Sequence, residues 1–469
     1  MSNSLLKILS ESAEHSSCHG LANISKSRNW FIRTLWILCF SASSSYCIYN
    51  LTLSLIDFFN YDVHTKVENH RKPSIEYPAI TICHKSLINP QKLKQYSPDL
   101  YDTFLESKNF IIKSIDSSSS IAEYLANLEY NFILNFLKYS NEIDNITYGL
   151  DDILIDCYFS YHRCTKDHFE RLLIPKLGNC FKFNSGILMH RNKNKPGESV
   201  YAGTNGGLKL VLNIISEDEL NIMKSNGIQM YIHSLSTIPY SSFDLINLPS
   251  GFDTNIAIVQ EHTTKLPKPY SDCIQETESF DSKPFEKSQS LFGKYQQKFC
   301  IFICYYEYIR DLCGCYFVDV YGIEYSEACN ITKMHECIEQ FDGSFEPKKC
   351  LNSCPQECQS IVYYRQISQA YFPSRLIFDI LKAKNPDLFL DYEANKSSLL
   401  SVNVYHDDIS LKIIKDTPAK SIVQLIAEIG GFMGLCVGAS MLTVVECADL
   451  LFKVILFCKE FKVAKILPK

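Results

Sequence analysis

The sequence lacks the short motifs that mark several large enzyme classes. It has no Gly-x-Ser-x-Gly nucleophile elbow, no His-Glu-x-x-His zinc site and no Walker phosphate-binding loop. It also lacks an excess of positive charge, because its 469 residues carry a formal net charge of −6, and this gives no sign of a nucleic-acid partner. No internal repeat or low-complexity linker divides the chain. We therefore expect a protein that is not an enzyme and that binds no cofactor, metal or nucleic acid.

Cysteine, in contrast, is abundant and unevenly placed. The chain has 20 cysteines, and fourteen of them lie between Cys83 and Cys358. The others lie near the two ends, in or beside apolar segments: Cys18, Cys39, Cys47, Cys436, Cys447 and Cys458. An even number in the middle of the chain predicts an oxidising compartment and a disulfide framework. The sequence alone leaves the connectivity of that framework open.

Two long apolar segments flank the cysteine-rich middle. The first runs from about Trp30 to Phe59 and the second from about Ser421 to Phe457. Each exceeds the roughly 20 residues that cross a bilayer. A cleaved signal peptide is the alternative for the first segment, but its polar leader is long and its apolar run resumes after Ser41-Ala42-Ser43. A buried core helix is the alternative for the second segment, whose length disfavours it.

Basic residues border both apolar segments on the sides nearest the chain ends. Arg28 and Arg33 precede or begin the first, and the second ends among Lys453, Lys459, Lys462, Lys465 and Lys469. The positive-inside rule therefore places both termini in the cytoplasm and the middle outside, in agreement with the cysteines. We expect a multi-pass plasma-membrane protein in contact with lipid. Its parts would be a cytoplasmic segment (1–29), a first membrane helix (30–59), an extracellular domain (60–418), a second membrane segment (419–457) and a cytoplasmic tail (458–469).

The extracellular middle combines strand and helix patterns, so we expect an α+β domain. Alternating or β-branched stretches predict strands at 74–82, 208–215, 229–233 and 400–405. Helical spacing marks 91–140, interrupted by a loop at 117–120, and also 297–309, where Cys300 and Cys304 share one helix face. Glycosylation sequons begin at Asn145, Asn330 and Asn395, all in the part expected outside.

The second apolar segment contains a row of small residues. Gly430, Gly434 and Gly438 recur every four residues, which places them on one face of a helix, and Ala439 and Ser440 follow. In a membrane such a row lets helices pack closely. The sequence alone favours packing; the alternative is backbone that lines a cavity, because open backbone is tolerated at membrane depth only there or when buried in protein.

Two acidic residues follow the row of small residues. Glu446 and Asp449 lie in the same apolar segment, where carboxylates are costly and by default functional. On an unbroken helix Asp449 would lie about 20° from Gly438, and Glu446 about 80° away. The alternative is that these acids sit at the cytoplasmic interface and pair with Lys453 or Arg33.

Several separate motifs together resemble the degenerin/epithelial sodium channel/acid-sensing ion channel superfamily. In chain order they are Ser16-Ser-Cys-His-Gly20, Tyr77-Pro-Ala-Ile-Thr-Ile-Cys83, Gly178-Asn-Cys-Phe-Lys-Phe-Asn184, Leu266-Pro-Lys-Pro-Tyr-Ser-Asp-Cys273, Cys300-x3-Cys304, Cys313-Gly-Cys315, Cys350-x3-Cys354-x3-Cys358, Gly430-Gly431 and Gly438-Ala-Ser440. The resemblance covers most of the chain. It implies a trimeric channel with two transmembrane helices and a disulfide-rich ectodomain of palm, finger, knuckle, β-ball and thumb, the thumb at about 274–365.

The resemblance also implies a disulfide pairing. The pairs would be Cys83–Cys180, Cys157–Cys164, Cys273–Cys358, Cys300–Cys354, Cys304–Cys350, Cys313–Cys337 and Cys315–Cys329. Five of the seven would staple the thumb and make it stiff, because each closed loop restricts the unfolded chain. The spacing Cys350-x3-Cys354 is wider than the Cys-x-Cys of many family members. The resemblance therefore determines the partners of these two cysteines less well than those of the others.

The resemblance further implies where ions pass. The family's Gly-x-Ser element breaks the second membrane segment and forms a constriction that favours sodium. Backbone carbonyls and rings of carboxylates can replace the hydration shell of a cation. Here the constriction would consist of Gly438, Ala439 and Ser440. The other pore and gate residues would be Glu428 near the outer mouth, Gly430, Gly431 and Gly434 before the constriction, and Glu446 and Asp449 after it.

Two further pairs of residues acquire roles from the resemblance. His19 and Gly20 would form a re-entrant turn that lines the inner pore and affects opening, and glycine suits a turn because it reaches positive φ cheaply. Tyr61 and Tyr270 would meet and couple the thumb to the membrane helix, a contact contributing about 0.5–1.5 kcal/mol beyond burial. Ordinary aromatic packing is the alternative, since the chain has 28 tyrosines.

The function implied by the resemblance is a voltage-independent, sodium-selective cation channel. It would be gated through its extracellular domain, sensitive to amiloride, and built as a homo- or heterotrimer with related subunits. One alternative is an ATP-gated trimeric channel, which would need lysine-rich phosphate-binding motifs and a different cysteine spacing. The other is a membrane-tethered ectoenzyme, adhesion or receptor protein, which would have no use for glycines and acids inside its anchor.

The stimulus stays open, because protons, peptides, mechanical load and constitutive opening all occur in the family. Carboxylates paired face to face would have raised pKa values and could sense acid, although acidic runs are more often solvated loops. The acidic runs outside are Asp151-Asp152, Glu217-Asp218-Glu219 and Asp407-Asp408. The histidines His162, His168, His190 and His233 are scattered, and we expect surface or hydrogen-bonded residues rather than metal ligands.

Overall fold

The structure is a computed structural model of the chain, which divides into two compact units. It describes residues 18–113, 129–130, 133–134, 138, 143–174, 177–185, 197–214, 225–239, 244–318, 327–340, 347–386, 389 and 391–466. Unit 1 comprises Met1–Thr65 and Asp416–Lys469, and unit 2 comprises Lys66–Lys415. Each unit is described by itself.

The described part of unit 1 is mainly helical. Its helices are α2 (His19–Lys26), α3 (Trp30–Phe59), α15 (Ile422–Val437) and α16 (Met441–Ile466). The side chain of Asn29 accepts a hydrogen bond from Phe31 N at the start of α3, and Ser421 forms a capping box with Gln424 at the start of α15. These caps satisfy backbone donors that a helix start leaves open. α3 packs against both α15 and α2.

Helix α3 is long and apolar enough to cross a membrane. α15 and the first part of α16, as far as Leu456, satisfy the same criterion only as a pair, and they are bent by 76° at the break between them. The first apolar segment is therefore one continuous helix, whereas the second consists of two helices.

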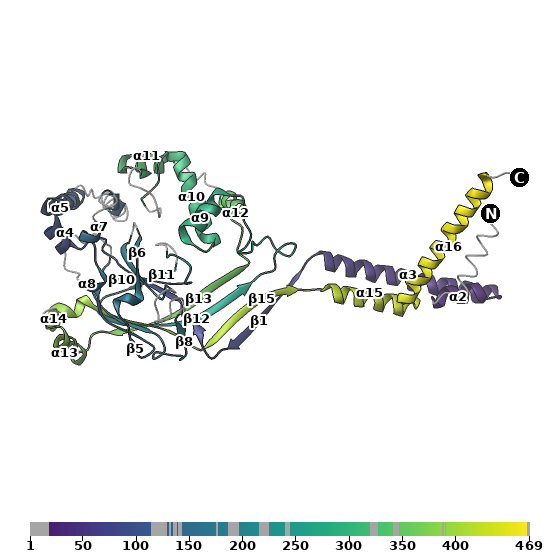
Figure 1. Ribbon diagram of the computed structural model, residues 1–469, viewed down its shortest axis with the longest axis horizontal. Coiled ribbons are helices and arrows are strands. Elements are labelled where there is room, and N and C mark those ends of the chain that lie inside the picture. The colour runs from purple at the N-terminus through teal and green to yellow at the C-terminus, as the bar shows by residue number, and fades with distance from the viewer. Residues whose placement is uncertain are drawn as a thin grey trace. The chain divides into compact units, whose positions relative to one another are not determined.

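The described strands form three sheets (Figure 1). The largest has the order β1 (Val63–Arg71), β15 (Ser410–Pro418), β12 (Phe252–Thr264), β14 (Leu399–His406), β9 (Leu208–Asn213), β4 (Leu154–Phe159) and β5 (His162–Arg163), with β13 (Gln359–Tyr371) also paired to β12. The second has the order β11 (Leu245–Leu248), β10 (Ile228–His233), β3 (Ala79–His84), β7 (Gly178–Phe183) and β6 (Phe169–Ile174). β2 (Ile75–Glu76) and β8 (Glu198–Ser199) form a short ladder.

One hydrophobic core joins the two larger sheets. Leu210 and Val404 of the first sheet belong to the same buried cluster as Ile80 and Phe183 of the second. Tyr77, which directly follows β2, is fully buried, and its hydroxyl donates to Val404 O at 2.7 Å. The apolar faces of both sheets are thus removed from water together, which is the main stabilising contribution to such a domain.

The helices of unit 2 gather in separate groups around the sheets (Figure 1). The first group contains α4 (Pro90–Tyr96), α5 (Pro98–Lys113), α7 (Ile143–Ile146) and α8 (Leu150–Ile153). The second contains α9 (Lys283–Phe292), α10 (Gln297–Cys313), α11 (Ile331–Gln340) and α12 (Pro347–Ser353). The third contains α13 (Arg375–Lys384) and α14 (Tyr392–Asn395), and the short 3-10 turns are η2 (Lys166–His168) and η4 (Lys396–Ser398).

Seven disulfides brace unit 2, and they are the same seven pairs that the resemblance implies. They are Cys83–Cys180, Cys157–Cys164, Cys273–Cys358, Cys300–Cys354, Cys304–Cys350, Cys313–Cys337 and Cys315–Cys329. The first joins directly opposed residues of β3 and β7. Five of the others lie in and around α9–α12, where they reinforce small hydrophobic clusters between these helices.

A short helix explains the wide spacing of Cys350 and Cys354. Because α12 covers Pro347–Ser353, four residues correspond to about one helical turn, which matches the spacing of Cys300 and Cys304 on α10. The bonds Cys300–Cys354 and Cys304–Cys350 therefore join two antiparallel segments at two levels about one turn apart.

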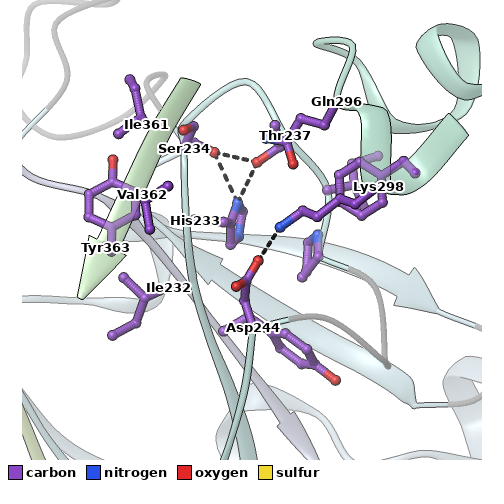
Figure 2. Close-up of a pocket in the computed structure, with 14 residues that line it drawn as sticks. Ile232, His233, Ser234, Thr237, Asp244, Gln296, Lys298, Ile361, Val362 and Tyr363 are labelled. Atoms are coloured by element: carbon purple, nitrogen blue, oxygen red, sulfur yellow. Dashed lines mark hydrogen bonds and ion pairs between the residues drawn. The ribbon is translucent and has the colours of Figure 1, made fainter. Parts of the chain in front are cut away.

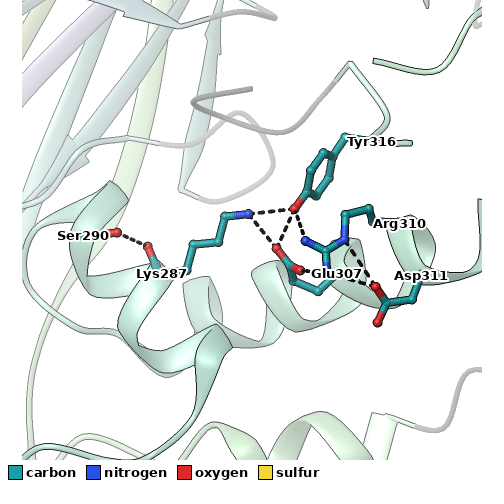
Figure 3. Close-up of polar contacts among 6 residues, drawn as sticks. All are labelled: Lys287, Ser290, Glu307, Arg310, Asp311 and Tyr316. Atoms are coloured by element: carbon teal, nitrogen blue, oxygen red, sulfur yellow. Dashed lines mark hydrogen bonds and ion pairs between the residues drawn. The ribbon is translucent and has the colours of Figure 1, made fainter. Parts of the chain in front are cut away.

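A polar network also ties α9 to α10 (Figure 3). Lys287 Nζ lies 2.6 Å from Glu307 Oε1, and the hydroxyl of Tyr316 donates to the same oxygen at 2.8 Å. Arg310 donates to the Tyr316 hydroxyl at 2.9 Å and pairs with Glu307 Oε2 at 2.8 Å, while its other contact is Asp311. Two cations therefore share one carboxylate, and charge-assisted hydrogen bonds of this kind are stronger than neutral ones.

The sequence predicted several of these elements. The strands expected at 208–215, 229–233 and 400–405 are β9, β10 and β14, and the expected helix at 297–309 is α10, which runs on to Cys313. The strand expected at 74–82 is instead two strands, β2 and β3, separated at Tyr77-Pro78. Of the helical stretch 91–140, α4 and α5 are present, and the loop expected at 117–120 lies outside the described residues. The disulfide-rich α+β domain is confirmed.

Three histidines of unit 2 lie inside the protein. Burial lowers the pKa of His84 to about 4, that of His406 to about 4, and that of His233, with help from Lys182, to about 3. His84 stacks on Tyr148. Neither ring nitrogen of His406 has a hydrogen-bond partner among the described residues. A protonated His406 would therefore be a buried charge without a hydrogen bond to stabilise it.

These histidines predict that acid destabilises unit 2. Between the unfolded pKa of about 6.5 and the native values, the unfolded chain binds more protons, so the free energy of unfolding falls as pH falls. Each histidine contributes up to about 1.4 kcal/mol per pH unit within that window. We expect the melting temperature of the solubilised chain to drop between pH 7 and pH 4.5, and His406→Leu to reduce the drop. A His162→Gln control, at an exposed position, should melt as the wild type does. An unchanged pH dependence in His406→Leu would contradict the argument.

Candidate functional site

The second apolar segment breaks where the sequence places Gly438-Ala439-Ser440. α15 ends at Gly438, which has a left-handed conformation with φ of 69°. The amides of Gly438 and Ala439 close the helix end by donating to Gly434 O and Met433 O. Ser440 directly precedes α16 and caps its start, because its amide donates to Thr443 Oγ1 at 2.9 Å and its carbonyl accepts from Thr443 N. The break is thus a hydrogen-bonded turn with its own capping groups.

Residues far away in sequence hold the carbonyls just before the break. Ser43 on α3 donates its hydroxyl to Cys436 O at 2.6 Å. The thiol of Cys18 donates to Val437 O at 3.2 Å. In an apolar segment each open carbonyl is costly, so these two donors help to stabilise the end of α15.

The glycines before the break do not pack against α3. A Cβ added at Gly430 or Gly431 would meet no atom within 4 Å among the described residues, and one at Gly434 would lie 3.8 Å from Ala439 O. Within one chain the row of small residues therefore leaves open space. Close packing through this row between chains stays a prediction.

A polar cluster joins the last turns of α3 to the start of α15. Lys420 Nζ lies 2.8 Å from Glu428 Oε2, 3.0 Å from Ser54 Oγ and 3.7 Å from Asp57 Oδ2. Ser54 also donates its hydroxyl to Glu428 Oε2 and is buried. The positive charge of Lys420 therefore offsets the negative charge of Glu428, which we expected to attract cations at an outer mouth. A ring of three Glu428 side chains would attract cations less than the sequence alone suggests.

Glu446 and Asp449 lie on α16, beyond the break. Their expected directions relative to Gly438 assumed an unbroken helix, and that assumption is wrong because α15 ends there. Asp449 Oδ2 lies 2.6 Å from Lys453 Nζ, one turn further along, and both side chains are more than half exposed. This ion pair is the alternative considered for Asp449 from the sequence. Pore lining by these two acids stays a prediction.

Gly20 serves a different purpose from the one expected. It is not in a turn with positive φ, since it is the second residue of α2 and is absent from the positive-φ residues described. It is buried, and a Cβ at this position would clash with the ring of Phe40 on α3. Glycine is therefore needed here for the close approach of two helices. The role of His19 and Gly20 in opening stays a prediction.

The two tyrosines expected to meet belong to different units. Tyr61 has a positive φ of 54°, and its ring lies 6.3 Å from those of Phe58 and Phe59. Tyr270 lies in a turn in which its amide donates to Pro267 O. Their contact stays a prediction.

Unit 2 contains a small polar cavity of about 70 Å³ between β10, β13 and the start of α10 (Figure 2). At its wall, His233 Nδ1 lies 2.9 Å from Ser234 O and 3.1 Å from Thr237 Oγ1. Lys298 and Asp244 form an ion pair beside it. A space of this size accommodates about two water molecules. His233 is thus a hydrogen-bonded core residue, as the sequence predicted.

Three carboxylates of the acidic runs, at positions that the structure describes, pair with basic side chains. Within the described residues, Asp151 pairs with Lys166, Asp152 with Lys92 and Asp408 with Arg71. Glu217-Asp218-Glu219 lies outside the described residues.

A facing pair of carboxylates occurs elsewhere. Glu76 and Glu198 are directly opposed across β2 and β8. Partial desolvation, and secondly the charge of Glu198, raises the pKa of Glu76, although both side chains are exposed at the surface. The two residues are far apart in sequence, so no local pattern of the chain predicted the pair.

The remaining expected sites are distributed over the surface. Asn145 and Asn330 are exposed, whereas Asn395 is half-buried and its side-chain oxygen accepts a hydrogen bond from Asp391 N. Glycosylation at these positions stays a prediction. His162 is exposed and His168 is half-buried, and His190 lies outside the described residues. Among the residues described, no group of three or more His, Cys, Asp or Glu could hold a metal ion.

Sequence reasoning missed the polar residues that hold the helices of unit 1 together. Ser43 and Ser54 lie within the first apolar segment, and Lys420 directly precedes the second. One signal could have revealed them, because polar groups inside apolar segments usually face a partner. Their partners could not be read from the sequence, since the two segments are separated by the whole of unit 2.

The architecture is that of a membrane channel subunit, with a continuous apolar helix, a broken apolar segment and a disulfide-braced domain between them. Residues 12–450 match the model of the amiloride-sensitive sodium channel family, and the chain belongs to this family. Its members are ion channels and not enzymes, and they need no cofactor.

Curated relatives match nearly the whole chain. The bile acid-sensitive ion channel of Homo sapiens is 26% identical over 93% of this chain and 84% of its own length. Acid-sensing ion channel 2 of Homo sapiens is 25% identical over 94% of this chain and 86% of its own length. A solved proton-activated chloride channel matches with a TM-score of 0.34 and 6% identity, covering 90% of this chain and 98% of that chain, a likeness too weak to support any conclusion.

The polar cluster around Lys420 predicts that this residue stabilises unit 1. In Lys420→Met the carboxylate of Glu428 loses its closest cation, and we expect a loss on the order of 1 kcal/mol in the free energy of unfolding. Thermal unfolding of the solubilised chain measures the change. Lys453→Met is the matched control, because it breaks an ion pair whose members are both more than half exposed, and such pairs contribute little. Equal effects of the two substitutions would contradict the prediction.

Proposed function

We propose that the chain is a subunit of a trimeric, voltage-independent, sodium-selective cation channel of the plasma membrane. The channel is gated through its extracellular domain, which corresponds to unit 2, and it is blocked by amiloride. α3 and the α15–α16 pair cross the membrane, and both termini are cytoplasmic. Membership of the amiloride-sensitive sodium channel family supports this proposal.

The observation that carries the proposal is the break at Gly438. An unbroken helix keeps its carbonyls in its own hydrogen bonds, whereas a break turns backbone groups toward the surroundings, where they can replace water around an ion. Such a break is tolerated at membrane depth only where it lines a cavity or is buried in protein. Open space beside Gly430 and Gly431 supports the approach of further copies at this level.

The stimulus is proposed to be extracellular acid or a bile acid, which are the agents named in the relatives. For acid, Glu76 and Glu198 are a candidate site, because protonation of one carboxylate would relieve the repulsion across β2 and β8. The buried histidines are poor candidates between pH 5 and 7, since their pKa values of about 3 and 4 keep them neutral there.

The test is two-electrode voltage-clamp recording from cells that express the full chain alone. We expect an inward current that depends on external sodium, shows no voltage-dependent gating, falls with amiloride, and rises with either acid or a bile acid. Water-injected cells are the control. Surface biotinylation shows whether the chain reaches the membrane. A chain that is present at the surface but silent under all conditions, alone and together with related subunits, would count against the proposal.

A substitution at the break predicts a change in selectivity. In Gly438→Ala the left-handed conformation costs about 1–2 kcal/mol for an L-residue, so the turn shifts and the carbonyls around it move. We expect the ratio of sodium to potassium permeability to fall severalfold, measured from reversal potentials. Gly251→Ala is the matched control, because Gly251 also has positive φ, with open space around it, but lies in unit 2. Selectivity lost equally in both variants would contradict the role of Gly438.

A further inference from the structure

The helix α3 buries little of itself within one chain. Among its residues, all of which the structure describes, only Cys47 and Ser54 are buried. Ser54 belongs to the polar cluster of Lys420. Cys47 is 5% exposed and marks a second point at which α3 meets α15.

At this second point two thiols meet. The side chains of Cys47 and Cys436 lie close enough to interact. Cys436 is the penultimate residue of α15, and its carbonyl accepts the hydroxyl of Ser43 at 2.6 Å. Ser43 precedes Cys47 by four residues, so both lie on one face of α3. The backbone and the side chain of Cys436 are therefore both held by the same face of the neighbouring helix.

The surroundings favour a cross-link over a resident metal. Within the described part of the chain, no third His, Cys, Asp or Glu joins this pair to form a group that could hold a metal ion. Two thiols already in contact between two helices fulfil the first requirement for a disulfide, which is proximity. Both cysteines are reduced in the structure.

We propose that Cys47 and Cys436 form a modification site, at which hydrogen peroxide, a small membrane-permeant oxidant, joins the two thiols in a disulfide between α3 and α15. Cys436 is half-buried and Cys47 is buried, so the peroxide meets Cys436 first. In the first step the attacking species is therefore the thiolate of Cys436.

The reaction balances in two steps. The thiolate of Cys436 attacks one peroxide oxygen, the O–O bond breaks, and a sulfenic acid and hydroxide form, the hydroxide taking up the thiol proton as water. The sulfur of Cys47 then attacks the sulfenic sulfur, the S–O bond breaks, and a second water leaves with the proton of Cys47. Two thiols are oxidised by two electrons, and one hydroperoxide is reduced by two. A reducing dithiol reverses the reaction by exchange.

The cross-link would fix the last turn of α15 to α3 two residues before Gly438. Its formation is independent of the proposed function, whereas any effect on ion flow rests on that function. The experiment therefore has a chemical part and an electrical part.

In the chemical part, intact cells that express the full chain are treated with hydrogen peroxide, and free thiols are then blocked with N-ethylmaleimide. Mass spectrometry of unreduced peptides should show the Cys47–Cys436 cross-link at least tenfold above its level in untreated cells, and dithiothreitol should remove it. The seven disulfides of unit 2 in the same digest report correct folding. Copper–phenanthroline serves as a second, faster oxidant.

Single-cysteine substitutions test which two residues form the cross-link. Cys47→Ala and Cys436→Ala should each abolish the cross-link, and Cys39→Ala, an exposed position on the same helix, should retain it. The proposal is overturned if both cysteines carry maleimide after both oxidants, or if the cross-link that forms joins Cys18 to Cys447 instead, which also lie near each other.

In the electrical part, peroxide should change the wild-type and Cys39→Ala currents at least twofold, reversibly with dithiothreitol, and leave the Cys47→Ala current unaltered. A cross-link with an unaltered wild-type current upholds the modification site and rejects its effect on ion flow. A cross-link in a chain without current upholds the site and counts against the proposed function alone.

Discussion

The structure of unit 1 depends on the need of every backbone carbonyl in an apolar segment for a donor. α15 stops at Gly438, and the end of any helix leaves carbonyls without partners inside the helix. Here the hydroxyl of Ser43 and the thiol of Cys18 reach two of them, and Gly438 closes the end by its own amide. The break therefore requires α3 and the segment before α2 to be in place, so three parts of the chain that are distant in sequence define one turn.

The charged side chains of unit 1 also differ in whether a neighbouring helix contacts them. Lys420 contacts Glu428, Ser54 and Asp57, so the charged groups at the start of α15 are held by the neighbouring helix. Asp449 instead pairs with a lysine of its own helix and stays largely exposed. Glu428 and Asp449 both lie in the second apolar segment. Their surroundings differ, because only Glu428 is part of the contact between helices.

The sequence predicted correctly those features that depend on local periodicity or that the family resemblance implies. The strands β9, β10 and β14 and the helix α10 follow from periodicity, and the pairing of the seven disulfides was implied by the resemblance to a known family. The bend at Gly438 invalidated angles calculated for a straight helix. Gly20 was expected in a turn but lies in α2. Its contact with Phe40 depends on how α2 packs, and no local sequence pattern shows that packing. The pairs Glu76–Glu198 and Cys47–Cys436 were missed for the same reason, since each joins residues that only the folded chain brings together.

The paired disulfides between α10 and α12 have a mechanical consequence. A single bond between two helices acts as a pivot about which each can still turn. Two bonds about one helical turn apart, Cys300–Cys354 and Cys304–Cys350, remove that rotation and also prevent one segment from sliding along the other. The two segments can then move only as one body, and a displacement applied at either end is transmitted along its length without being absorbed between them.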